Sequence, residues 1–215
     1  MRYYPIQVDL KDKPVLVVGG GEVATRRISG LLEAGARVTV VAPEVSDVLR
    51  KMIVMKLVAH TPRVFKEVDL GGYQLVFAAT NDKEVNKDIA RLCHWRKLLC
   101  SVVSDAKLGD FVVPSRISRG DLLVTVSTDG KVPFLSRQIR LELEKLYGPE
   151  MEDLIEILSQ KRRELLADEK SYLVEKMARM DLAPLRDALK KGGVALARQW
   201  LDDFLQHSLT LQSAR

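Results

Sequence analysis

The stretch that most constrains the fold of this chain is an apolar run leading directly into three glycines. Residues 15–18 are all valine or leucine, the character of a strand that is buried on both faces of a parallel sheet. Glycines occupy positions 19–21, and residues 22–34 then follow the apolar spacing of a helix. A strand, a glycine turn and a helix in this order predict the first unit of a doubly wound α/β fold.

Within this stretch, Gly19, Gly21 and Ala24 match the pattern G-x-G-x-x-A that is typical of dinucleotide binding. Gly19 permits the tight turn out of the strand, Gly21 leaves no Cβ between the backbone and a pyrophosphate, and Ala24 lets the helix pack closely on the strand. The anion would then lie at the positive end of the helix, so Glu22 and Val23 are also expected at the cofactor. The alternative is a glycine turn without a ligand.

The end of the second predicted strand, residues 37–42, bears on which nucleotide is bound. An acidic residue there would normally hold the ribose hydroxyls of NAD, but the strand ends in Ala42 and Pro43, with Glu44 slightly farther along. No arginine follows the strand to favour the extra phosphate of NADP. We therefore predict NAD as the cofactor, with Ala42 and Pro43 beside it.

The rest of the first half alternates strands and helices, which favours a parallel sheet. Strands are predicted at residues 54–59, 74–80 and 98–103, and helices at residues 44–52 and from Asn81 or Asp82 to about Trp95. The loop formed by Thr80, Asn81 and Asp82 leaves the carboxyl end of a central strand, where ligands bind in open sheets. Asn81 and Asp82 are therefore interpreted either as helix caps, as cofactor contacts, or as both.

The pattern changes after residue 103. Residues 121–127 read as a strand, residues 128–131 as a turn, and a helix begins at Pro133 and runs to about residue 147. Such a small strand-and-helix unit cannot bury both of its faces alone, which predicts a homodimer. From residue 150 onward the chain is helical in pattern, with Pro184 and residues 192–193 separating two helices. The expected domains are a dinucleotide-binding Rossmann domain (1–112), a dimerisation region (113–148) and a C-terminal helical domain (149–215).

Composition excludes several classes of function. The chain has 215 residues, a net charge of +5 and only 6% aromatic residues, which argues against a single-stranded nucleic-acid platform. No apolar run approaches the roughly 20 residues of a membrane span. Cys93 and Cys100 form no C-x-x-C pair, and no signal peptide is recognised, so we expect two reduced core thiols in a cytoplasmic protein. The histidines at positions 60, 94 and 207 are far apart, and no metal site is predicted.

Basic residues concentrate in one segment of the chain. They are Arg116, Arg119, Lys131, Arg137 and Arg140, opposed only by Asp121 and Asp129. Such a cluster suits a polyanionic small molecule, and ordinary surface charge is the alternative.

Several of these motifs together resemble one family. They are Val17-Val-Gly-Gly-Gly-Glu-Val-Ala24, Val38-Thr-Val-Val-Ala-Pro43, Ala78-Ala-Thr-Asn-Asp82 with Asn86, and Val126-Ser-Thr128. In this order they resemble the precorrin-2 dehydrogenase family, which includes stand-alone precorrin-2 dehydrogenase/sirohydrochlorin ferrochelatases and the N-terminal module of siroheme synthase. The chain stops near the point where the fused enzymes would begin their methyltransferase module, and so resembles the stand-alone form.

The resemblance implies an enzyme that oxidises precorrin-2 to sirohydrochlorin with NAD in siroheme biosynthesis. Some members also insert ferrous iron, and whether this chain does so is left open. The residues that would hold the carboxylates of precorrin-2 are Arg116, Arg119, Ser127, Thr128, Lys131 and Arg137. The family usually has an aspartate where this chain has Ser104, with Asp105 next. Asp105 is therefore the predicted base, and Ser104 would pass a proton or fix a water.

Asp105 has an alternative interpretation as a loop residue in an Asx turn.

Two other classes of function stay open for the whole chain. They are a non-catalytic NAD-sensing regulatory module and an oxidoreductase for another anionic substrate. NAD binding without affinity for a tetrapyrrole would favour the regulatory module.

Overall fold

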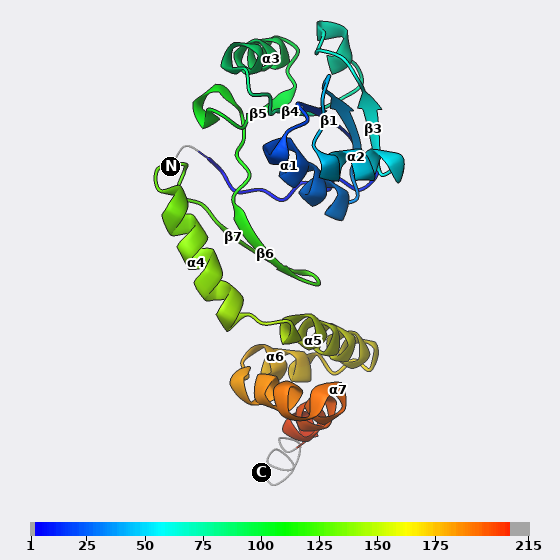
Figure 1. The fold of residues 1–215 in the computed structure, drawn as a ribbon. Coiled ribbons are helices and arrows are strands. Elements are labelled where there is room, and N and C mark those ends of the chain that lie inside the picture. Colours follow the sequence, from blue (N-terminus) through cyan, green and yellow to red (C-terminus); the bar gives the residue numbers. More distant parts are fainter. Residues whose placement is uncertain (1–2, 207–215) are drawn as a thin grey trace. The chain divides into compact units, whose positions relative to one another are not determined.

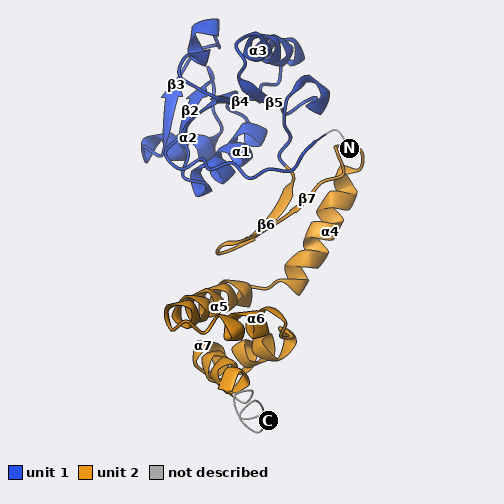
Figure 2. Cartoon of the chain, turned by 180° about the vertical axis from the view of Figure 1, so that it is seen from behind, with its two compact units in different colours: residues 1–113 blue, residues 114–215 orange. Residues whose placement is uncertain are grey.

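The computed structural model describes residues 3–206 of the chain. The chain divides into two compact units, an N-terminal unit up to Val113 and a C-terminal unit from Pro114 (Figure 2). Each unit has its own core.

The N-terminal unit is a five-stranded parallel sheet in the order β3-β2-β1-β4-β5 (Figure 1). Its strands are β1 Pro14–Val18, β2 Arg37–Val41, β3 Val58–Thr61, β4 Leu75–Ala78 and β5 Leu99–Val102. Its helices are α1 Glu22–Glu33, α2 Asp47–Val54 and α3 Lys83–Trp95, with short 3₁₀ turns η1 Glu67–Leu70 and η2 Ala106–Leu108. The strand order reverses between β1 and β4, which confirms the predicted doubly wound fold and places a ligand crevice at the carboxyl ends of these two strands.

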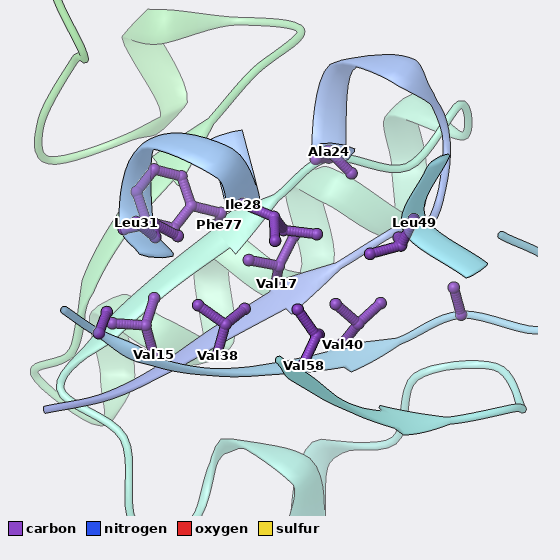
Figure 3. Packing of buried hydrophobic residues seen from close by; sticks show 13 residues of the cluster. Val15, Val17, Ala24, Ile28, Leu31, Val38, Val40, Leu49, Val58 and Phe77 are labelled. Atoms are coloured by element: carbon purple, nitrogen blue, oxygen red, sulfur yellow. The ribbon is translucent and has the colours of Figure 1, made fainter. Parts of the chain in front are cut away.

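The central position of β1 in the sheet explains why its residues are apolar without interruption. Val15 and Val17 belong to a core cluster that includes Ile28 of α1 and Leu49 of α2 (Figure 3). Leu16 and Val18, on the other side of the strand, pack in a second cluster that contains residues of α3. A strand covered on both faces has no position for a polar side chain.

Two neighbouring predicted elements of this unit, the helix at residues 44–52 and the strand at residues 54–59, were wrong in their bounds. The strand expected at residues 54–59 begins only at Val58, and α2 extends to Val54. Ser46 accepts a hydrogen bond from the Leu49 backbone amide and so starts the helix three residues later than predicted. Met55 and Leu57 are exposed in the turn between α2 and β3, so apolar character alone did not indicate a strand there.

The two cysteines lie where a core interpretation expects them. Cys93 of α3 and Cys100 of β5 are both buried and free. A hydrogen bond with Cys93, together with burial, raises the pKa of the Cys100 thiol. The pair therefore behaves as packing for the second core cluster.

The C-terminal unit begins with an antiparallel hairpin of β6 Ser115–Arg119 and β7 Leu122–Val126. Within the described residues, the helices that follow are α4 Pro133–Leu146, α5 Glu150–Ala167, α6 Ser171–Ala178 and α7 Ala183–Gln206. The sequence did not predict β6, because Ile117 is its only apolar residue and two of the other four are arginines. Ile117 is nevertheless 2% exposed, and Gly120 makes the turn with a φ of +54°.

A third apolar cluster holds the helices of this unit together. Leu154, Leu185 and Leu201 are its largest fully buried members, and Leu122 of β7 packs against it. The hairpin and the helices therefore share one core. Gly193 interrupts α7 with a φ of +67° and a ψ of −163°, as the predicted separation at residues 192–193 requires. Residue His207 lies outside the described residues.

Two features of the described residues bear on function. None of the helices among residues 3–206 is long and apolar enough to cross a membrane. The same residues contain no group of three or more His, Cys, Asp or Glu side chains arranged to hold a metal ion.

Candidate active site

The first glycine of the loop after β1 is held against the loop after β4. Gly19 has a φ of +121°, and a Cβ built on it would lie 2.3 Å from the carbonyl oxygen of Ala79. Only glycine permits both this backbone angle and this approach. The sequence predicted Gly19 for the tight turn; the structure adds that it brings together the two loops that border the switch point.

The third glycine has the opposite surroundings. A Cβ on Gly21 would meet nothing within 4 Å, so the space in front of this backbone is open. Gly21 is the N-cap of α1, and no side chain caps the helix there. The first-turn amides of a 12-residue helix therefore face the open space with their partial positive charge. Glu22 and Val23 are both exposed at this turn, and Ala24 is fully buried on the strand side. These features fit the pyrophosphate of a dinucleotide.

The middle glycine is a site residue that the sequence pattern missed. A Cβ on Gly20 would lie 2.1 Å from the carbonyl oxygen of Glu44, in the loop after β2. The Ser46 amide donates to the Gly20 carbonyl at 2.8 Å, and the Ser46 and Thr25 hydroxyls are 2.8 Å apart. The signal for Gly20 in the sequence was that positions 19–21 are all glycine, although the G-x-G-x-x-A pattern allows any residue at position 20.

The end of β2 lies at the same edge of the sheet. Ala42 is 3% exposed, whereas Pro43 and Glu44 are exposed beyond it. The Ala42 carbonyl oxygen lies 2.9 Å from Nε2 of His60 on β3, a contact that the sequence did not indicate. With Ala42 buried, the exposed atoms available to a ribose at this corner belong to residues 43 and 44.

The loop after β4 is organised by its own side chains. Asp82 caps α3 by accepting from the Glu84 and Val85 amides at 2.9 and 3.2 Å, as the cap interpretation predicted. The Thr80 hydroxyl lies within 2.9 Å of the Asp82 carbonyl oxygen and accepts from the Asp82 amide at 3.2 Å. Asn81 is exposed between them. Cap and cofactor contact do not exclude each other, and the cofactor contact stays a prediction.

The loop after β5 carries the two predicted catalytic residues. Ser104 is exposed, and its hydroxyl oxygen lies 3.3 Å from the amide nitrogen of Asn86, a buried residue of α3. Asp105 is the N-cap of η2, and its carboxylate accepts from the Lys107 amide at 2.9 Å. This bond is the one expected if Asp105 is a loop residue in an Asx turn, the alternative interpretation of this residue. It occupies one carboxylate oxygen, so a further role for Asp105 stays a prediction.

In the C-terminal unit, the predicted turn at residues 128–131 is present. Asp129 and Gly130 have φ values of +52° and +76°, and the Lys131 amide donates to the Thr128 carbonyl at 2.9 Å. The Thr128 hydroxyl lies 3.0 Å from that of Ser136, which fixes the start of α4, and the Ser127 hydroxyl accepts from the Asp129 amide. These two hydroxyls shape the turn, and Lys131 is exposed on it.

The predicted basic cluster is divided in the structure. The hairpin register pairs Ser115 with Val126, so Arg116 lies at the end of the hairpin next to residues 127–131. Arg119 pairs with Leu122 beside the turn at the opposite end. Arg140 forms an ion pair with Glu144 on the same helix. Arg116 and Lys131 therefore share one end of this unit, and Arg119 does not belong with them.

Comparisons with known proteins identify the family. Residues 6–115 match the model of a family described as "Putative NAD(P)-binding". A solved structure, "SirC, precorrin-2 dehydrogenase", superposes with a TM-score of 0.68 and 30% sequence identity, covering 95% of this chain and 98% of that one. This chain belongs to the precorrin-2 dehydrogenase family.

Longer relatives of this family include siroheme synthases. That of Methylobacillus flagellatus is 44% identical over 146 residues, which are 68% of this chain and 31% of the relative. That of Psychromonas ingrahamii is 43% identical over 162 residues, or 75% of this chain and 34% of the relative. The chain thus spans about a third of the length of these curated relatives.

The family match divides the predicted site residues into two groups. All the predicted cofactor residues, and Ser104 and Asp105, fall inside the NAD(P)-binding stretch. All the predicted substrate residues, from Arg116 to Arg137, lie after it. In this member of the precorrin-2 dehydrogenase family, cofactor binding thus belongs to the N-terminal unit.

Proposed function

We propose that this protein catalyses the NAD-dependent oxidation of precorrin-2 to sirohydrochlorin, a step toward siroheme. The observation that carries the proposal is the match to SirC, a precorrin-2 dehydrogenase, over 98% of that chain. The same region in the siroheme synthases is similar in sequence, at 44% identity in the first of them.

The glycine loop supports a dinucleotide as the oxidant. Gly21 leaves the space in front of its backbone open, and the first turn of α1 presents amides that no side chain caps. The loop after β2 offers Glu44 to the ribose, and no arginine stands among residues 42–46 to hold a 2′-phosphate. When bound, NAD supplies the acceptor for a hydride.

Residues of the C-terminal unit are proposed to hold the substrate. Precorrin-2 carries many carboxylates, and Arg116, Lys131 and Arg137 offer exposed cations near the turn before α4. Charge-assisted hydrogen bonds to carboxylates are about twice as strong as neutral ones. These residues would fix the orientation of the macrocycle, on which hydride transfer depends.

The loop after β5 is proposed to handle the proton. The oxidation removes one hydride and one proton from precorrin-2, giving sirohydrochlorin, NADH and H⁺. Asp105 would accept the proton on the carboxylate oxygen that is not bonded to the Lys107 amide. Ser104, immediately before it, would orient the group from which the proton leaves.

We further propose a homodimer in the cytoplasm. On the hairpin, Leu123 is exposed, on the strand face opposite to that of Leu122, which packs against the third apolar cluster. On α4, Phe134, Leu135 and Leu146 are also exposed. A second copy of the chain would cover these side chains, and the two free cysteines suit a reducing compartment.

The test is an anaerobic reaction of the purified protein with precorrin-2 and NAD, followed by absorbance. Appearance of NADH and sirohydrochlorin in equal amounts is expected. NAD binding without either product would contradict the proposal and favour a regulatory module. Addition of ferrous iron to the same cuvette then shows whether iron is inserted as a second substrate. Replacement of NAD by NADP tests the cofactor preference.

A further inference from the structure

Asn86 is a polar residue at a core position of α3. Its side chain is 0% exposed, and the other buried residues on this face of the helix are Ile89, Ala90 and Cys93. A buried amide is costly unless all of its hydrogen-bonding groups are satisfied. The presence of Asn86 at this position therefore indicates hydrogen-bond partners, with which an apolar residue could not bond.

The partners of Asn86 lie in two loops at the cofactor edge. Its Oδ1 accepts from the amide and from the hydroxyl of Thr80, at 3.0 and 2.8 Å. Its Nδ2 donates to the Thr80 carbonyl oxygen at 2.9 Å and to the Ser104 hydroxyl oxygen at 3.3 Å. The Thr80 amide can only donate and its carbonyl can only accept, so the orientation of the Asn86 amide is determined by these two contacts.

This orientation has a consequence for Ser104. Because the hydroxyl oxygen of Ser104 accepts from Asn86, its own hydrogen is directed to another acceptor. Among residues 3–206, no protein group is found to accept that hydrogen, and Ser104 is exposed at the end of β5. A hydroxyl held in this way presents a hydrogen-bond donor to a ligand at the edge of the sheet.

Thr80 and Ser104 depend on Asn86 to different degrees. The Thr80 hydroxyl also contacts the backbone of Asp82, and the Asp82 carboxylate independently caps α3. The Ser104 side chain is held by Asn86 alone among the described residues. Loss of the Asn86 amide should therefore release Ser104 more than it disturbs the loop after β4.

We propose that Asn86 is a positioning residue of the oxidation, which acts by fixing the Ser104 hydroxyl as a hydrogen-bond donor toward the bound ligands. The inference rests on the proposed function and deepens it. Asn86 does not touch the ligands itself. It acts through Ser104 and also links the loops after β4 and β5.

The experiment is a double-mutant cycle on turnover. The variants are Asn86→Ala, Ser104→Ala and both together, assayed with saturating NAD and precorrin-2 below their unfolding temperatures. Asn86→Ala is expected to lower kcat about tenfold in the parent and less than about twofold in the Ser104→Ala background. The KM for NAD should change less than about threefold, since the loop after β4 keeps its other bonds.

Two further variants separate positioning from stability. Ile89→Ala, three residues along α3, removes packing from the second core cluster and no hydrogen-bonding group, and should lower the unfolding temperature while kcat stays at the parent value. Asn86→Asp keeps an oxygen that accepts from Thr80 and replaces the donor to Ser104 by an acceptor, which would draw the Ser104 hydrogen back to the protein, so kcat should fall as it does in Asn86→Ala.

The outcomes are distinct. Equal losses of kcat in both backgrounds, or a fall in unfolding temperature with normal kcat as in Ile89→Ala, would overturn the inference and leave the proposed function standing. An inactive parent protein in the same assay would overturn the proposed function and this inference with it.

Discussion

A Cβ atom on Gly19 would lie 2.3 Å from the carbonyl oxygen of Ala79, and one on Gly21 would contact nothing within 4 Å. Glycine is thus needed at these two positions of one motif for different physical reasons. Gly19 lets two loops of the protein approach each other, and Gly21 leaves space for something that is not protein. The same substitution at the two positions should separate these roles.

Gly19→Ala is expected to destabilise the N-terminal unit by about 3 kcal/mol or more, because its φ of +121° and its contact with a backbone oxygen both oppose a side chain. Chemical denaturation followed by circular dichroism measures this loss. A stable variant with normal NAD affinity would contradict the role of close packing against Ala79.

Gly21→Ala is expected to leave stability unchanged and to weaken NAD binding. The added methyl group meets no protein atom but projects into the space assigned to the pyrophosphate. We expect the Kd for NAD, measured by titration calorimetry, to rise about tenfold or more, which corresponds to about 1.4 kcal/mol. Unchanged affinity would place the pyrophosphate elsewhere.

The contrast between these glycines shows how far the sequence predicts the site. The strand, the glycine turn and α1 were all predictable, since buried parallel strands and glycine loops leave strong local patterns. The fingerprint did not distinguish packing from ligand space, and it ignored Gly20. That glycine is required by the loop after β2, at 2.1 Å from the Glu44 oxygen, and only the fold brings those loops together.

The C-terminal unit was harder to predict for a related reason. Strand β6 buries Ile117 and leaves its polar residues partly or fully exposed, so it carries no apolar run. Without β6 the pairing of the hairpin is unknown, and Arg119 is assigned to the same cluster as Arg116. The register shows that they lie at opposite ends. Likewise, the role of Asn86 depends on a contact with Ser104, 18 residues away.

Asp105 can be tested by two substitutions that differ in one property. Asp105→Asn keeps an oxygen that accepts from the Lys107 amide and removes the base, whereas Asp105→Ala removes both. If Asp105 takes the proton, both variants should lose turnover by at least about 100-fold with unchanged NAD affinity. Normal turnover of Asp105→Asn would reduce the residue to a cap of η2.

The basic residues beside the turn before α4 should affect substrate binding selectively. Lys131→Ala is expected to raise the KM for precorrin-2 about three- to tenfold, the value of one charge-assisted hydrogen bond, with the KM for NAD unchanged. Lys145→Ala, at the other end of α4, is the matched control and should leave both constants unchanged. Arg119→Ala should resemble the control, because Arg119 lies at the far end of the hairpin; an effect as large as that of Lys131→Ala would contradict the division of the cluster.

The ion pair between Arg63 and Asp69 should make the N-terminal unit sensitive to acid. Two hydrogen bonds of 2.6 and 2.8 Å from the Arg63 guanidinium hold the pKa of the Asp69 carboxyl below its ordinary value of 3.8. A carboxyl whose pKa is lower in the folded state stabilises the fold at every pH above its unfolded pKa, and this contribution is lost as the pH falls through the folded value. Asp69→Asn lacks the titration, so the unfolding temperatures of parent and variant, well separated near neutral pH, should converge as the pH falls below 3.8. Thermal unfolding across a pH series measures this, and a difference that stays constant down to acid pH would show that the carboxylate charge contributes nothing to stability.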